Sequence, residues 1–501
     1  MRSLFSSGQW RATPRRRSHI LLALLLVLIV IAAAACNNQT DNPNRDHKAP
    51  ETTLRTGNNG RKTRASDSLN NWINWNILFT PKTDSAYRAQ YMAVLRSNII
   101  AYIRANTQFF RNNAPVPYDS NTNSLIRINY CTCDPLLYNI AVGLYTDPKI
   151  DTTGEIVTPT PSKPIGVHGG LVERISNNDA LDQGNPQLQA LRFPRLFDTT
   201  FLSGTTVPVD TSQILGIIDT GIDSTLFSPA VLRLSQGNDL VFNSLPEADP
   251  KDVSDNGSFS HGSIVIAQAL RQYSGRYPRI MVIKAFDNKG SGSVFSASCG
   301  IKYAIDHHAS LINASWGYYG DPDSVLLHYI AMTAQPTASA RPILFIAAAG
   351  NDTTGTGNAD TICLHEIKKA NELKSGHHFF PACFSPLMNN MLVVTGLSRD
   401  IYGNFFPCYY QNYSRTFVSV GVQDSGQCCS YNIPFVSLPV TGTSFCAPVV
   451  SGKIGAFLLK NPAATAPPTA QGYLSLIGGQ ASSRDTFTIQ GRFISSRQGN
   501  R

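Results

Sequence analysis

Four polar residues border apolar segments in this 501-residue sequence, and their chemical types suit nucleophilic catalysis. Asp219 and Asn351 each follow an apolar run, whereas His261 and Ser444 each precede one. A serine hydroxyl becomes a nucleophile when a base removes its proton, and imidazole titrates in the right range. The base needs an orienting carboxylate, and the oxyanion of a tetrahedral intermediate needs fixed donors such as an amide. Together the four side chains supply these groups.

The aspartate and the asparagine are expected at the tips of buried strands. Residues 214–218 and 343–348 are short, continuous apolar runs, which are typical of parallel strands covered on both faces. Asp219 directly follows the first run, and Asn351 closely follows the second. Ligand sites of open α/β sheets collect at the carboxyl ends of such strands. Both side chains are therefore expected at one edge of a sheet.

The histidine and the serine are expected at the beginnings of helices. Gly262 keeps the backbone beside His261 clear, and Gly442 permits a close backbone approach ahead of Ser444. A hydroxyl at a helix N-terminus faces the positive end of the helix dipole. Pro448 falls early in the second helix, where we expect its missing N–H to cost no hydrogen bond. Each segment alone is explained by a cap or a turn, but the set favours catalysis.

With these segments the chain resembles the subtilisin-like serine peptidases (subtilases), whose triad follows the same chain order Asp, His, Ser. The resemblance covers roughly residues 205–475. It implies that Ser444 attacks the peptide carbonyl, that His261 transfers the proton and that Asp219 orients the imidazole. It also implies that Asn351 and the Ser444 backbone N–H hold the oxyanion. The matching segments are Asp219-Thr220-Gly221, His261-Gly262-Ser263, Ala348-Ala349-Gly350-Asn351, and Gly442-Thr443-Ser444 with Ala447-Pro448.

A fifth segment, Asn313-Ala314-Ser315-Trp316-Gly317, resembles the family segment that lines the pocket for the residue before the scissile bond. The chain departs from the family pattern at Ser263, Ile264 and Phe445, none of which is a reacting group. An insertion between Asn351 and Pro381 falls where the family shapes the pocket floor, so the side-chain preference stays open. The substrate-binding residues implied by the resemblance are Ser315, Trp316, Gly317, Ala348, Ala349 and Gly350.

Alternating strands and helices predict an α/β fold for residues 205–475: a parallel β-sheet flanked by helices on both faces. A small α+β region over residues 84–145 precedes this catalytic domain and is interpreted as either a prosegment or an accessory domain. Strands are expected at 214–218, 280–285, 311–314, 343–348 and 391–395, and helices at 262–270, 294–307, 324–334 and 445–459. The remaining segments are predicted to be a disordered tether (36–83), a linker and lead-in (146–204) and a C-terminal tail (476–501).

The N-terminus has the order of a secretory signal, because arginines at 15, 16 and 17 precede the apolar residues 20–35. That run is shorter than the ~20 residues of a membrane span. The sequence Ala33-Ala34-Ala35-Cys36 resembles a bacterial lipoprotein signal. We therefore expect removal of residues 1–35, lipidation of Cys36, and an exported protein held at the cell envelope by this lipid anchor. Ordinary cleavage and an uncleaved anchor are the alternatives.

The charge and the cysteines limit which classes of ligand the protein is expected to bind. The formal net charge of +9 lies largely in the leader, and no basic stripe with interleaved aromatics follows, so no nucleic-acid partner is expected. Export permits disulfides among the ten cysteines. We expect Cys363 to pair with Cys383 and Cys446 to be a buried free thiol. Cys131-Thr132-Cys133 and Cys428-Cys429 lack zinc-ligand spacing with a matching second pair, so no metal site is expected.

The predicted function is hydrolysis of polypeptides by a serine endopeptidase that needs no cofactor, with structural calcium and the oligomeric state left open. One rival is a catalytically inactive subtilase fold that serves as a binding lipoprotein, although all four reacting positions are filled. The other is a lipase or esterase. The chain order and the absence of a Gly-x-Ser-x-Gly sequence around Ser444 disfavour it.

Overall fold

The protein is described here by a computed structural model. No helix among the described residues is long and apolar enough to span a bilayer. The expected signal 1–35, Cys36 and Cys363 lie outside the described residues. These are residues 72–105, 126–143, 172–177, 180–182, 208–237, 239–255, 260–288, 290–335, 341–351, 371–399, 402, 404–408, 411–423, 442–462, 467, 469–482 and 487–496.

A ten-stranded sheet forms the centre of the larger domain within these ranges. Its neighbouring strands are parallel, except that β17 and β15 run antiparallel to β18 and β14. The order is β17 (Gln480–Ala481), β18 (Arg492–Ser495), β16 (Val420–Gln423), β14 (Met391–Arg399), β12 (Leu344–Ala348), β10 (Leu311–Ala314), β6 (Val209–Asp219), β8 (Tyr277–Lys284) and β7 (Val241–Asn243), with β15 (Phe405–Pro407) beside β14.

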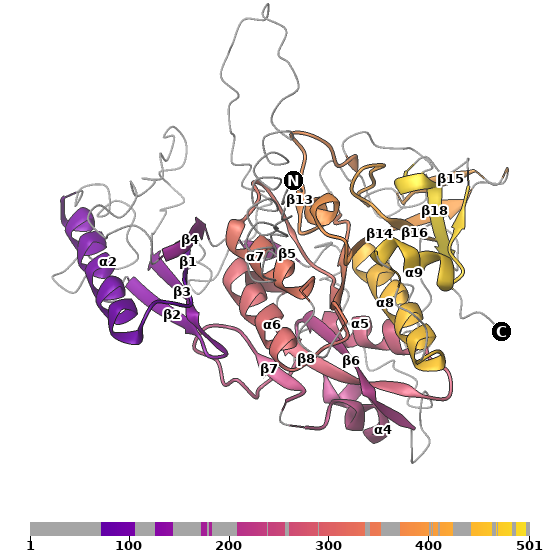
Figure 1. Cartoon of the computed structure of the whole chain (residues 1–501), viewed down its shortest axis with the longest axis horizontal. Coiled ribbons are helices and arrows are strands. Elements are labelled where there is room, and N and C mark those ends of the chain that lie inside the picture. Colours follow the sequence, from indigo (N-terminus) through magenta and orange to yellow (C-terminus); the bar gives the residue numbers. More distant parts are fainter. Residues whose placement is uncertain are drawn as a thin grey trace, which may run out of the picture. The chain divides into compact units, whose positions relative to one another are not determined.

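Helices cover both faces of this sheet (Figure 1). Side chains of β12 show the division, because Phe345 and Ala347 join one buried cluster while Leu344 and Ile346 join the other. The alternation arises because successive side chains of a β-strand point to opposite faces of the sheet. The first cluster includes α6 (Val294–Asp306) and α7 (Ser324–Thr333), and the second includes α5 (His261–Leu270), α8 (Thr443–Lys460) and α9 (Ala470–Leu476).

The predicted fold class is confirmed: the domain is α/β, with a mostly parallel sheet between two helical layers. The expected strands and helices agree with the observed elements to within a few residues, apart from β6, β8 and β14, which are longer. One boundary needs correction, because β17 and β18 lie in residues 476–501, which were expected to be a tail. The sequence signal there is weak, since these strands are short and depend on the neighbouring β16 for pairing.

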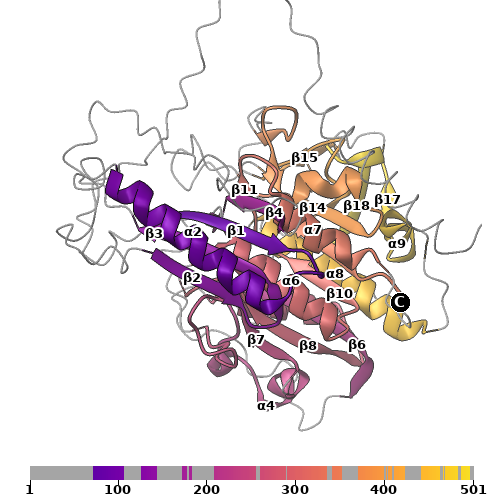
Figure 2. The same ribbon diagram turned by 60° about the vertical axis from the view of Figure 1, so that its left-hand side comes forward.

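A second sheet precedes the catalytic domain. It is antiparallel, in the order β2 (Ile126–Cys131), β3 (Asp134–Gly143), β1 (Trp72–Phe79) and β4 (Val172–Asn177). Helix α2 (Ser85–Ala105) connects β1 to β2 and runs across this sheet, where the rings of Tyr91 and Phe79 lie 5.3 Å apart (Figure 2). We call residues 72–177 the N-terminal unit.

Two expected boundaries are wrong at this unit. Strand β1 lies inside residues 36–83, predicted to be a tether, and β4 lies inside residues 146–204, predicted to be a linker. Both strands pair with partners far away in sequence, so a local window carries little sign of them. On β1, Phe79 contacts α2, whereas Leu78 belongs to the same buried cluster as residues of α6 and α7.

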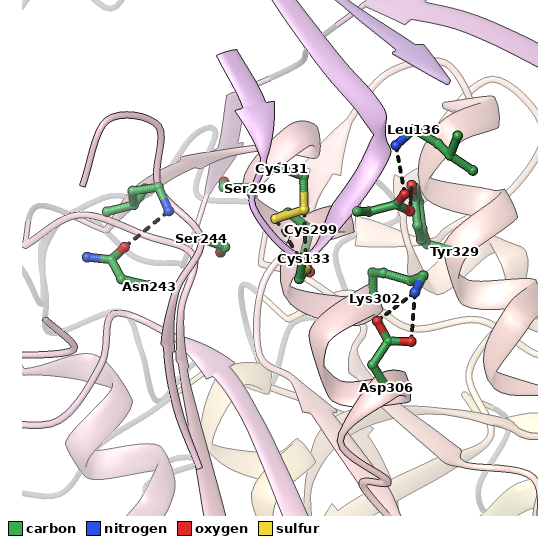
Figure 3. Close-up of a disulfide and its surroundings, with 12 residues drawn as sticks. Cys131, Cys133, Leu136, Asn243, Ser244, Ser296, Cys299, Lys302, Asp306 and Tyr329 are labelled. Carbon is green, nitrogen blue, oxygen red and sulfur yellow. Dashed lines mark hydrogen bonds and ion pairs between the residues drawn. A yellow bond between two sulfur atoms is a disulfide. The ribbon is translucent and has the colours of Figure 1, made fainter. Parts of the chain in front are cut away.

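The N-terminal unit is bonded covalently to the catalytic domain. Cys131, at the end of β2, forms a disulfide with Cys299 of α6, and Tyr329 of α7 donates a 2.6 Å hydrogen bond to Asp134 of β3 (Figure 3). The sequence did not predict this pairing. The expected Cys363–Cys383 disulfide is wrong, because Cys383 is a buried thiol. Cys446 is also a buried thiol, as expected.

Short strand pairs complete the description. Strand β5 (Ala180–Asp182) pairs with β9 (Ser291–Ser293), and β11 (Tyr318–Tyr319) pairs with β13 (Phe379–Phe380). Helix α4 (Pro229–Leu232) follows β6, and Ser228 caps it by accepting from the backbone N–H of Val231. The pair β11–β13 lies next to the candidate site.

Candidate active site

Asp219 and His261 meet where strand β6 ends and helix α5 begins. The Nδ1 atom of His261 lies 2.8 Å from Oδ1 of Asp219, and both side chains are almost fully buried. The same carboxylate oxygen accepts a 2.8 Å hydrogen bond from the backbone N–H of Thr220. A buried carboxylate held in this way fixes the orientation of the imidazole ring and favours the tautomer protonated at Nδ1.

The Thr220 side chain joins the strand tip to the helix. Its hydroxyl donates to Asp255 over 2.6 Å and accepts from the backbone N–H of Gly262 over 2.8 Å. Gly262 must be small here, because a Cβ atom would overlap the carbonyl oxygen of Gly221. The sequence analysis named Thr220 as part of a motif but gave it no function, and it did not select Asp255. That residue is 35 positions from Thr220, so only the folded chain brings them together.

A buried lysine contacts the backbone next to Asp219. The Nζ atom of Lys284, at the end of β8, donates to the Thr220 carbonyl over 2.6 Å and to Asn288 over 2.7 Å. Burial lowers the pKa of Lys284, and the nearby carboxylates, Asp255 foremost among them, oppose that shift. The carbonyl contact holds the backbone just after Asp219.

Ser444 is the second residue of α8, which follows Gly442. Gly442 has φ +129°, a conformation that side-chain-bearing residues rarely adopt. Backbone N–H groups in the first turn of a helix have no carbonyl partner within the helix, and such groups form anion sites in proteins. The Ser444 hydroxyl donates to the Ser315 carbonyl over 3.1 Å. The ring of the next residue, Phe445, lies 5.2 Å from the His261 ring, which places the start of α8 beside the imidazole.

Pro448 has a consequence that the sequence interpretation missed. It is an interior residue of α8, so its missing N–H leaves the Ser444 carbonyl, four positions earlier, without its helical donor. The Ser315 hydroxyl supplies that bond instead, donating to the Ser444 carbonyl over 2.8 Å. Asn313 in turn donates to the Ser315 hydroxyl over 2.9 Å. Ser315 thus holds the backbone at Ser444. The proline does cost the helix one hydrogen bond, and the Ser315 side chain offsets that loss.

Asn351 lies beyond the tip of β12 and contacts the start of α8. Its Oδ1 accepts a 3.0 Å hydrogen bond from the backbone N–H of Thr443. A backbone N–H is only a donor, so this contact sets the amide orientation and leaves Nδ2 as the outward donor. Nδ2 lies 3.6 Å from where a Cβ of Gly442 would stand. The amide N–H groups and the Ser444 N–H therefore belong to one small region.

The six residues implied to bind substrate are all buried: Ala348 is the last residue of β12, and the other five lie in the segments that follow β10 and β12. Trp316 packs against Phe286, with ring centroids 5.8 Å apart. The Ala349 carbonyl accepts from Asn412 over 2.9 Å. Gly317 and Gly350 both face the ring of Phe379, a residue that the sequence interpretation did not select.

One thiol cluster has ligand atoms close enough for a metal ion. The sulfur atoms of Cys131, Cys133 and Cys299 lie within 4.8 Å of one another. Two of these sulfurs form the disulfide, and the cluster belongs to the junction with the N-terminal unit. It therefore gives the candidate active site no metal ligand.

The chain is similar in sequence to known bacterial proteases. The chain is 34% identical over 109 residues to the cell wall-associated protease of Bacillus subtilis (strain 168), covering 21% of this chain and 12% of that protein. It is 28% identical over 173 residues to the intracellular serine protease of Paenibacillus polymyxa, covering 33% and 50%. It is 31% identical over 148 residues to the thermophilic serine proteinase of Bacillus sp. (strain AK1), covering 29% and 34%. The chain thus spans half or less of these relatives' lengths.

The chain also resembles solved protein structures in its fold. Fervidolysin from Fervidobacterium pennivorans is 16% identical with a TM-score of 0.41, covering 79% of this chain and 55% of that chain. The epidermin leader peptide processing serine protease of Staphylococcus aureus is 13% identical with a TM-score of 0.44, covering 85% and 97%. The family model described as the subtilase family matches residues 210–475, which is more than half of the chain and includes Asp219, His261 and Ser444. The chain therefore belongs to the subtilase family.

Proposed function

We propose that the protein is a serine endopeptidase with Ser444 as its nucleophile. In the first step the Ser444 oxygen attacks the carbonyl carbon of a peptide bond while Nε2 of His261 accepts the hydroxyl proton. His261 then returns that proton to the leaving amine, which leaves an acyl-enzyme. Water attacks the ester in the second half of the reaction, with His261 again serving as base. Asp219 keeps the ring oriented and stabilises the imidazolium.

The oxyanion is proposed to lie between Nδ2 of Asn351 and the backbone N–H of Ser444. Both donors are fixed before substrate arrives, Asn351 through Thr443 and Ser444 through the helix and Ser315. Preorganised donors stabilise developing charge without reorganisation, which is why they act mainly on the transition state. The Ser444 hydroxyl donates to the Ser315 carbonyl in this state, so a rotation about its Cα–Cβ bond must precede proton transfer to His261.

The buried 2.8 Å contact between Asp219 and His261, next to the start of α8, carries this proposal. An inactive binding protein has no need of an aligned carboxylate and imidazole beside a serine on a helix N-terminus. An esterase would use the same groups, so substrate type is the discriminating measurement.

Covalent labelling with a fluorophosphonate probe and a peptide-versus-ester activity panel test the proposal. We expect labelling and peptide hydrolysis by the wild type and loss of both in Ser444→Ala. The matched control is Ser298→Ala, which removes another fully buried serine hydroxyl, on α6 at the opposite face of the sheet. Labelling that survives in Ser444→Ala would mean that a different residue is the nucleophile, and ester-only turnover would favour the lipase or esterase.

We also propose that the chain is exported and anchored through a lipid on Cys36, so that it acts at the cell envelope. The support is the charged, apolar, small-residue and cysteine order of residues 15–36. Metabolic labelling with palmitate should mark the wild type but not Cys36→Ser, with peptide hydrolysis retained in both. Equal label in both proteins would contradict the anchor.

A further inference from the structure

The side chain of Phe379 occupies the space between the two segments implied to bind substrate. Strands β10 and β12 are parallel neighbours with Ala314 opposite Ala347, so their continuations run side by side to Gly317 and Gly350. A Cβ on Gly317 would overlap Cε1 and Cζ of Phe379, and a Cβ on Gly350 would lie 2.7 Å from Cδ1 and Cε1. The same ring atom therefore touches both glycines.

The ring is held there by its own strand and by neighbours. β13 pairs antiparallel with β11, with Phe379 opposite Tyr319, and the two rings lie 5.0 Å apart at 64°. Asn412 ties the arrangement together, because Nδ2 donates to the Ala349 carbonyl and to the Tyr319 hydroxyl over 2.9 and 2.7 Å. Phe379 is only 5% exposed. The Phe379 side chain is thus buried and fixed by contacts with its neighbours.

The two glycines make sense as walls of a side-chain pocket. Adjacent strand continuations without Cβ atoms leave a slot whose width suits a flat or aliphatic group. In this chain that slot already contains an aromatic ring from the chain itself. A substrate side chain would have to displace Phe379 to enter.

We propose that Phe379 closes the pocket for the residue before the scissile bond, so that the enzyme selects substrates with glycine, or at most alanine, at that position. This inference rests on the proposed peptidase function and deepens it by naming a substrate class. Phe379 acts by excluding bulk and takes no part in the bond-breaking steps. The selectivity comes from steric exclusion, since a packed interior resists insertion of a larger group.

A peptide series that varies only the residue before the scissile bond tests the proposal. The wild type should cleave the glycine peptide and discriminate strongly against leucine and phenylalanine peptides. In Phe379→Ala the ratio of kcat/KM for phenylalanine over glycine should rise about 10–200-fold, the discrimination available from a hydrophobic pocket. Phe379→Leu should admit small aliphatic residues larger than alanine. This variant replaces Phe379→Ala in the test if circular dichroism shows that Phe379→Ala does not fold.

The adjacent Phe380→Ala is the matched control. Phe380 is equally buried in β13 but packs against Phe384, with ring centroids 4.5 Å apart, and against Tyr318. Its loss should lower stability without changing the order of preference. A similar change in preference for both variants would overturn the proposal, because loosened packing alone would then explain it.

Two further outcomes separate this inference from the function on which it rests. If the wild type labels at Ser444 and cleaves phenylalanine peptides as readily as glycine peptides, the peptidase stands and the closed pocket is refuted. If the wild type neither labels with a fluorophosphonate nor cleaves any peptide of the series, the proposed function fails and the substrate class fails with it.

Discussion

Single hydrogen bonds hold Ser444, the proposed nucleophile, in place. Pro448 removes the donor that would pair with the Ser444 carbonyl, and the Ser315 hydroxyl replaces it. That carbonyl belongs to a buried residue, and buried backbone carbonyls need a donor, which the Ser315 hydroxyl supplies in place of the helical N–H. The segment implied to bind substrate thus also stabilises the helix that carries Ser444.

This arrangement predicts a coupling between Ser315 and Pro448. Ser315→Ala should lower the free energy of unfolding by about 1–3 kcal/mol, because a buried carbonyl loses its donor. Adding Pro448→Ala should recover part of the loss, since a backbone N–H four residues after Ser444 can then form the helical bond. Denaturant unfolding of the two single variants and the double variant measures the coupling. Strictly additive effects would show that the two positions do not share this carbonyl.

The Asn351 side chain offers two separable functions, an acceptor for Thr443 and a donor toward the proposed oxyanion. Asn351→Ala should lower kcat about 10²–10³-fold with little change in KM, the size of effect that loss of one oxyanion donor has in subtilisin. Asn351→Asp keeps the acceptor but loses the donor, so we expect a loss at least as large.

Steady-state kinetics on a peptide substrate, with circular dichroism as the folding control, check both variants. Near-normal turnover by Asn351→Asp would assign this residue to holding Thr443 rather than to the oxyanion. A large rise in KM at constant kcat would instead place it in substrate binding.

At the scale of elements, the carboxyl edge of the sheet assembles the site because its strands are parallel. β6 delivers Asp219, β10 leads to Ser315, and β12 leads to Asn351. Since neighbouring parallel strands end at the same edge, three distant segments reach one place without long loops. The two helices on the same face, α5 and α8, then bring His261 and Ser444 to that edge.

The last strand of the chain is part of this support. β18 pairs with β16, and its residues Phe493 and Ile494 are 6% and 1% exposed. Deleting residues 480–501 also removes Phe487, which is 7% exposed, and should therefore lower the free energy of unfolding by roughly 4.5–9 kcal/mol, at about 1.5–3 kcal/mol for each of the three buried apolar side chains. Deleting only residues 497–501 leaves β18 intact and is the control. An unchanged thermal midpoint in the longer deletion would mean that β18 is dispensable.

At the scale of the whole molecule, the Cys131–Cys299 disulfide makes the N-terminal unit a covalent partner of the catalytic domain. The bond joins residues 168 positions apart and is accompanied by the Asp134–Tyr329 contact. Cleavage of the chain between the two parts would therefore not separate them in an oxidising compartment. The N-terminal unit would therefore stay attached after cleavage, whether it is a prosegment or an accessory domain.

The disulfide predicts that release of the N-terminal unit requires reductant. With a specific protease site inserted between residues 183 and 207, the cut protein should run as one species in non-reducing denaturing gels and as two under reduction. Cys299→Ser is the informative variant, because it removes the partner of Cys131 and also of the neighbouring Cys133, whose sulfur lies 3.8 Å from Cys299. Two species in the non-reduced wild type would refute the covalent link.

Cys133 should be chemically silent in the folded protein. Burial is the main cause that raises its pKa from 9.0 to about 12, so the thiol stays protonated at pH 8 and lacks the thiolate needed for alkylation or exchange. Reactivity should rise only as the pH approaches that value. Iodoacetamide labelling at pH 8 should be slow in the native state and fast in urea. Equally rapid labelling in both would place Cys133 in an exposed setting.

The residue types of the candidate site and the elements that carry them could be predicted from the sequence. Asp219 and His261 stand in local motifs beside strongly apolar runs, and both the chemistry of a hydroxyl nucleophile and the period of buried strands can be recognised within short windows. The structure places these two side chains 2.8 Å apart as the strand-tip and helix-start positions predict.

The contacts between distant segments could not be predicted from the sequence. Strands β1 and β18 are specified by pairing partners that lie far away in the sequence. Cys131 could have paired with any of several cysteines, and the role of Ser315 depends on a carbonyl 129 residues away. Phe379 follows an insertion whose path no local pattern gives, so its place between Gly317 and Gly350 emerges only when three segments pack together. Such contacts depend on shape and distance in the folded chain, which residue types and spacing do not encode one window at a time.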